Sequence, residues 1–106
     1  MNIEQVREQV SAGEYSLRPH AIQHAAKEGF NSSDILHAVL TGEVIEHYPD
    51  RNRCLFYADI VVERIILPLH VVCEFNPELD TVVVDIVTAY VPTEEKWVSP
   101  RRRRRK

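Results

Sequence analysis

Two histidines four residues apart, His20 and His24, are the clearest candidates for chemistry in this sequence. In a helix, residues four apart lie on one face, and Lys27 follows one turn further on. Two imidazoles and an ammonium group together can bind a phosphate and transfer protons near neutral pH. The alternatives are a solvated polar face with one half-buried histidine, and half of a zinc site, although the glutamate of the metalloprotease pattern is missing.

His70 is the second candidate. It lies in a run of strand-forming residues, 65–75, whose alternation places His70 and Glu74 on one face and Leu69 and Val71 on the other. A histidine and a carboxylate on one strand face can share a substrate, or one can orient the other. The alternatives are a satisfied sheet histidine beside a surface glutamate, and a metal site that His70 completes with the two helical histidines. We predict no metal site and no cofactor.

Arg51 and Arg53 flank a predicted turn beside Tyr48. Guanidinium groups bind phosphate through two hydrogen bonds, and an aromatic ring can stack on a base. Tyr90, at the end of a later predicted strand, is a further residue that could stack or donate. The alternative is an ordinary solvated turn. The sequence has no glycine-rich phosphate loop, no serine nucleophile elbow and no carboxylate cluster for two metals, which disfavours nucleotide hydrolysis of those kinds.

Positive charge is concentrated at one end of the chain. Six of the 13 basic residues are residues 101–106, and the first 100 residues hold seven basic and sixteen acidic side chains, a difference of −9. This balance is not typical of a uniformly basic nucleic-acid binder, so contact with a polyanion must come from the tail or from a local cluster. We expect a disordered basic tail over residues 99–106 that contacts RNA or a partner, or that is a cloning or processing remnant.

The 106 residues, 44% hydrophobic and 27% charged, indicate a single globular domain over residues 1–98. No apolar run approaches the roughly 20 residues of a membrane span. The first residues show no basic segment followed by an apolar one, so we expect a cytoplasmic protein without a secretory signal. Cys54 and Cys73 lack the C-x-x-C spacing and are expected to be small buried hydrophobes.

Three helices are predicted in the first half of the chain, each ending near a glycine: Gly13, Gly29 or Gly42. In the second, over about residues 19–28, Ile22, Ala25 and Ala26 are expected to face the sheet. The second half favours strands over residues 43–48, 54–62, 65–75 and 81–90, with a polar turn at 76–80 and Trp97 packing over an edge. Helices followed by strands indicate an α+β domain, with two or three helices on one face of a three- to four-stranded antiparallel sheet.

Several short segments resemble the family called domain of unknown function 4258. The segments are Pro19-His20-Ala21 with Lys27-Glu28-Gly29-Phe30, residues 42–49, residues 68–72, and residues 88–92 with Trp97. The resemblance covers about residues 15–98. The family is similar in fold to RelE-like and MqsR-like toxins, small RNases of bacterial toxin–antitoxin pairs. Many members carry arginines in the second helix where this chain has His24 and Glu28, which shifts the basic role to His20, His24 and Lys27.

The resemblance implies a RelE-like fold and a toxin that cleaves mRNA without a metal ion, by attack of the ribose 2′-hydroxyl on the adjacent phosphorus. The expected catalytic roles are base for His20 or His24 and acid for His70. The residues expected to bind RNA through its phosphates or bases are Lys27, Arg51, Arg53, Tyr48 and Tyr90. The implied partners are RNA and a zinc-finger antitoxin of the YgiT or MqsA type, in a homodimer or a hetero-oligomer. A hypothesis from another class is a non-catalytic protein-interaction module of a small cytosolic complex.

Overall fold

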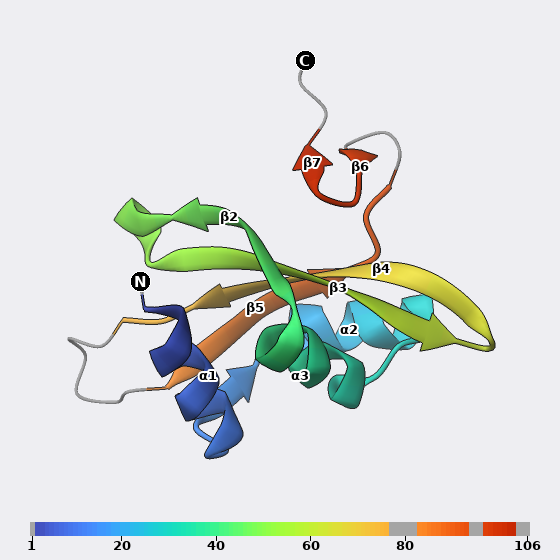
Figure 1. Cartoon of the computed structure of the whole chain (residues 1–106). Coiled ribbons are helices and arrows are strands. Elements are labelled where there is room, and N and C mark those ends of the chain that lie inside the picture. The colour runs from blue at the N-terminus through green and yellow to red at the C-terminus, as the bar shows by residue number, and fades with distance from the viewer. Residues whose placement is uncertain (1, 77–82, 94–96, 104–106) are drawn as a thin grey trace.

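The computed structural model describes residues 2–76, 83–93 and 97–103. Three helices cover one face of a five-stranded sheet, and a small hairpin lies over the other face (Figure 1). This arrangement confirms the predicted α+β class. In chain order, the elements are α1 (Ile3–Ser11), β1 (Tyr15–Leu17), α2 (Pro19–Glu28), α3 (Ser32–Thr41), β2 (Glu43–Tyr48), the 3-10 turn η1 (Pro49–Arg51), β3 (Arg53–Val62), β4 (Ile65–Glu74), β5 (Val84–Tyr90), β6 (Trp97–Ser99) and β7 (Arg102–Arg103).

The ends of the helices follow the signals in the sequence. Pro19 occupies the first turn of α2, where its missing N–H has no intrahelical partner, and Gly29 ends the helix at φ +84°. At the start of α3, Asn31 and Asp34 form a capping box in which each side chain accepts from the other's backbone N–H. The three predicted helices are therefore confirmed, with α2 at its predicted bounds.

The strand order in the sheet is β1-β5-β4-β3-β2, and the β2–β3, β3–β4 and β4–β5 pairs are antiparallel. Sequence analysis did not predict β1, which pairs in parallel with β5. Three residues are too few to show a period of two, so the pairing with β5 decides their conformation. The sheet thus has five strands instead of three or four. Residues 81–82, predicted as strand, and 77–80, predicted as turn, lie outside the described residues.

The main core lies between the helices and the sheet. Cys54 and Cys73 are both fully buried and unpaired, as predicted, and burial raises the pKa of the Cys54 thiol to about 12. The prediction for α2 was right at Ala25 but wrong at Ile22, which is 54% exposed, and at Ala26, which is also exposed, because Ala21 and Ala25 are the residues that α2 buries. Small alanine side chains let the helix approach β5 closely.

A second, smaller packed layer covers the opposite face of the sheet. Leu55, Tyr57 and His70 are buried there, and so is Trp97, only 3% exposed, whose ring centroid lies 4.3 Å from that of His70. We call residues 97–103 the C-terminal strap. Residues 99–103 were predicted as part of a disordered tail over 99–106. In the structure, the strap contains β6 and β7, Trp97 is buried, and Arg101 and Arg103 pair with carboxylates of β2. Residues 104–106 lie outside the described part of the chain.

Candidate functional site

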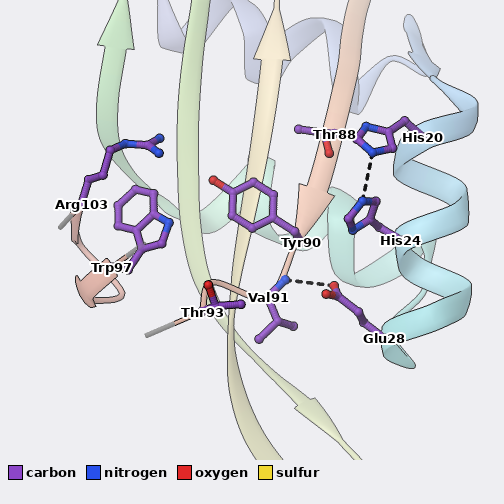
Figure 2. Close-up of a pocket in the computed structure, with 9 residues that line it drawn as sticks. All are labelled: His20, His24, Glu28, Thr88, Tyr90, Val91, Thr93, Trp97 and Arg103. Atoms are coloured by element: carbon purple, nitrogen blue, oxygen red, sulfur yellow. Dashed lines mark hydrogen bonds between the residues drawn. The ribbon is translucent and has the colours of Figure 1, made fainter. Parts of the chain in front are cut away.

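His20 and His24 line a hollow of about 420 Å³ between α2, the end of β5 and the C-terminal strap. Figure 2 shows the two rings directed from α2 toward β5, with Trp97 and Arg103 on the far side of Tyr90. The helix, the sheet and the strap therefore each supply part of the lining. The remaining lining residues are Glu28, Thr88, Tyr90, Val91, Thr93, Trp97 and Arg103.

The two helical histidines are in direct contact. Their Nε2 atoms lie 3.0 Å apart, and the ring planes are nearly perpendicular, at 85°. A hydrogen bond between these atoms requires that one nitrogen carries a proton and that the other does not. Nδ1 of His24 is buried and has no hydrogen-bond partner among the described residues, so Nε2 is the nitrogen through which this ring can act.

Glu28, rather than Lys27, is the third residue of α2 at the hollow. His20, His24 and Glu28 advance round the helix by about 40° at each step, toward β5. Lys27 lies on the other side of His20 and is exposed, so the predicted cluster of two imidazoles and an ammonium does not face the hollow as a unit. The Glu28 carboxylate accepts a hydrogen bond from the backbone N–H of Val91, at 3.0 Å, and so holds the end of β5 against the helix.

His70 does not line the hollow. Its ring is fully buried, its Nε2–H donates to the carbonyl of Pro100, and burial lowers its pKa. It contacts Tyr90 and Trp97, which do line the hollow, so the expectation that three histidines meet in one cleft is not met. Because His70 lies apart from His20 and His24, it does not complete a metal site with them. Within the described ranges, no three His, Cys, Asp or Glu side chains gather closely enough to hold a metal ion.

The residues predicted around the turn line a second hollow of about 200 Å³ on the same face of the sheet. It contains Tyr48, Arg51 and Arg53, and it meets the first hollow at Thr88 and Arg103, which line both. We call these two adjoining hollows together the strap groove. It brings six of the eight predicted site residues together and leaves out Lys27 and His70.

The three arginines in the strap groove differ in their partners. Arg53 forms an ion pair with Glu74, at 2.8 Å, and Arg103 forms one with Glu46, at 3.0 Å. Arg51 is exposed and makes no ion pair within the part of the chain that the structure describes.

Sequence reasoning missed Trp97 and Arg103 as parts of the site. Arg103 lies over the ring of Trp97, with its Cζ atom 4.6 Å from the ring centroid. Hydrogen bonding to Glu46 raises the pKa of Arg103, so the guanidinium stays charged. The signal that could have found them is a tryptophan just before an arginine block, in a chain whose body is strongly acidic.

No helix in the described ranges has the length and apolar character that a membrane crossing requires. Searches of curated proteins and of solved structures give no match to this chain. A family model described as a domain of unknown function matches residues 17–91. The matched range contains α2, α3 and β2 to β5, whereas α1 and the C-terminal strap lie outside it. The chain therefore belongs to the family of domain of unknown function DUF4258.

Proposed function

We propose that this protein is an endoribonuclease that cleaves single-stranded RNA without a metal ion, and that it acts as the toxin of a toxin–antitoxin pair. The observation that carries the proposal is the His20–His24 pair, whose Nε2 atoms lie 3.0 Å apart at the edge of a groove lined by arginines and tyrosines. The resemblance of the family to RelE-like and MqsR-like toxins supplies the toxin class, and it remains an analogy of fold.

In the proposed reaction, the side chains of His20 and His24 move apart, the hydrogen bond between their Nε2 atoms breaks, and the phosphodiester enters between the two rings. One imidazole accepts the proton of the ribose 2′-hydroxyl while the 2′ oxygen attacks phosphorus, and the other, protonated, gives its proton to the leaving 5′ oxygen. The O–P bond to the 2′ oxygen forms and the bond to the 5′ oxygen breaks, which yields a 2′,3′-cyclic phosphate and a 5′-hydroxyl. We assign the base to His20 and the acid to His24, so both roles lie within the helical pair and His70 takes neither.

The tyrosines and arginines of the strap groove would hold the RNA strand. Burial raises the pKa of Tyr90, so its hydroxyl stays protonated near neutral pH and can donate a hydrogen bond to the strand. Arg51, which has no carboxylate partner among the described residues, can bind a phosphate directly, and Tyr48 beside it can stack on a base. Arg53 is already paired with Glu74, so we expect a smaller contribution from it.

The test is RNA cleavage by the parent protein and by His20→Ala and His24→Ala. Removing a general acid or base lowers the rate by about 10²- to 10⁴-fold. His37→Ala is the matched control, because His37 is exposed on α3 and lies outside the strap groove. The products should carry a 2′,3′-cyclic phosphate, and RNA methylated at the 2′ oxygen should resist cleavage. RNA cleavage at the parental rate by both His20→Ala and His24→Ala would contradict the assignment. The absence of RNA cleavage by the parent protein would also contradict it.

A second candidate function is a non-catalytic protein-interaction module. The observation that favours it is the end of the β3–β4 hairpin, where Val61 and Ile66 are register partners and are 67% and 69% exposed. Exposed apolar patches of this kind mark protein-binding sites. Co-expression with the product of the adjacent gene, the expected zinc-finger antitoxin, tests this candidate. The interaction module would be favoured if the protein cleaves no RNA and forms a complex that Val61→Ser and Ile66→Ser abolish.

A further inference from the structure

We infer that Arg103, from the C-terminal strap, is the cation that binds an RNA phosphate at the centre of the strap groove, and that Glu46 is the carboxylate that positions it. This inference rests on the proposed function, because it names the RNA backbone as the ligand of the same groove. It adds a residue from outside the range that the family model matches.

The position of Arg103 is the first observation. Arg103 and Thr88 are the residues at which the two hollows meet, and Arg103 is the charged one of the two. A strand that runs from the histidine pair toward Arg51 therefore passes this guanidinium. Figure 2 shows the Arg103 side chain beside Trp97, across Tyr90 from the two histidines.

The hydrogen bonding of Arg103 is the second observation. Its Nε and Nη2 atoms donate to the two carboxylate oxygens of Glu46, at 3.3 and 3.0 Å. A guanidinium group has five N–H donors, of which the bonds to Glu46 use two. The hydroxyls of Tyr48 and Tyr90 also interact with this guanidinium by hydrogen bonding, so a phosphate would share the remaining donors with these hydroxyls or replace them. Glu46 and the ring of Trp97 hold the planar group in one orientation, which reduces the entropy lost when a phosphate binds.

The other cations are less suited to this position. Lys27 is exposed outside the groove, and Arg53 lines only the second hollow, whereas Arg103 lines both. Arg101, two residues before Arg103, forms the same kind of ion pair with Glu43, at 2.8 Å, but it lines a different hollow beside Tyr57. Arg101 is therefore a matched control for the strap without being part of the groove.

Glu46 separates a phosphate-binding role of Arg103 from a purely structural one. If the ion pair only fastens the strap, Glu46→Gln and Arg103→Gln weaken the same contact and have similar effects. If Arg103 binds phosphate, Glu46→Gln keeps a side-chain oxygen that can accept from the guanidinium and position it, but removes a negative charge beside the ligand. RNA binding should then become stronger, whereas Arg103→Gln makes it weaker. Only a phosphate-binding role of Arg103 predicts that the two substitutions change RNA affinity in opposite directions.

The experiment measures binding of a fluorescent, 2′-O-methylated oligoribonucleotide by anisotropy over a series of salt concentrations. Arg103→Gln should weaken binding by about 10- to 100-fold, as expected for a lost charge-assisted hydrogen bond. It should also reduce the slope of log K against log salt by about 0.7, the value for one phosphate contact of a single strand. Glu46→Gln should bind more tightly than the parent, and Arg101→Gln should bind as the parent does. Thermal unfolding establishes that each variant is folded.

The results separate this inference from the proposed function, because the methylated probe cannot be cleaved. Parental binding by Arg103→Gln, equal losses in Arg101→Gln and Arg103→Gln, or weaker binding by Glu46→Gln would each overturn the inference, even when the parent cleaves RNA. Failure of the parent to bind the probe would also overturn it. If the protein binds the probe through Arg103 but cleaves no RNA, the phosphate site is supported and the proposed nuclease function is refuted.

Discussion

Replacing Trp97 by alanine tests whether the C-terminal strap is part of the cooperative fold. Trp97 is 3% exposed, and its ring contacts that of His70 on the helix-free face of the sheet, where His70 in turn contacts Tyr57. Truncating a buried tryptophan to alanine costs about 3–5 kcal/mol of unfolding free energy. A domain of this size has about 5–15 kcal/mol in total, so the variant should fold but be much less stable.

The loss can be measured by urea denaturation followed by far-UV circular dichroism. With a slope of about 1.5 kcal/mol per molar urea, the midpoint should fall by about 2–3 M. Trp97 is the only tryptophan in the chain, so the fluorescence of the parent protein reports on the strap alone. We expect the fluorescence and circular dichroism transitions to coincide. Trp97→Phe is the control, and because it keeps a buried ring its midpoint should fall by less than half as much.

Two results would refute this reasoning. A loss below about 1 kcal/mol in Trp97→Ala would mean that the tryptophan is not packed as described, since such small losses are typical of surface positions. A fluorescence transition at lower urea than the circular dichroism transition would mean that the strap detaches before the sheet unfolds.

Two further predictions concern pH and backbone packing. Because burial lowers the pKa of His70 from its usual 6.5, the unfolded chain binds more protons than the folded one, and stability should fall as pH drops below about 6.5. Urea midpoints between pH 5 and 7.5 check this, and His70→Gln should flatten the decline; parallel declines in both proteins would contradict it. Gly42→Ala should cost about 2–3 kcal/mol, because a Cβ there would overlap the carbonyl oxygens of Ala38 and Tyr57. Gly13→Ala, at φ +81° in open space, should cost only about 1 kcal/mol, and thermal melts that reverse this order would contradict the packing argument.

Local signals in the sequence were sufficient for most of the secondary structure. Helix α2 has its predicted bounds because Pro19 and Gly29 act within a single turn of chain, through a missing N–H and a positive φ. Strand β2 also has its predicted bounds, from Gly42 to the turn at Pro49. The spacing of His20 and His24 likewise predicted their contact, since a helix alone brings residues four apart together.

The tertiary structure alone decided what surrounds that pair. The alternation along β4 correctly separates His70 from Leu69 and Val71, but it carries no information on what covers the His70 side of the sheet. The C-terminal strap covers that side of the sheet. A run of arginines is typical of a disordered segment, and only the folded structure shows that Arg101 and Arg103 pair with carboxylates of β2. Similarly, a periodic pattern locates the polar face of α2 only within a turn, and the close packing of Ala21 and Ala25 on β5 directs Glu28 rather than Lys27 toward the hollow. Caps and spacings act over a few residues and are written in the sequence, whereas charge pairing and burial depend on segments that meet only after the chain has folded.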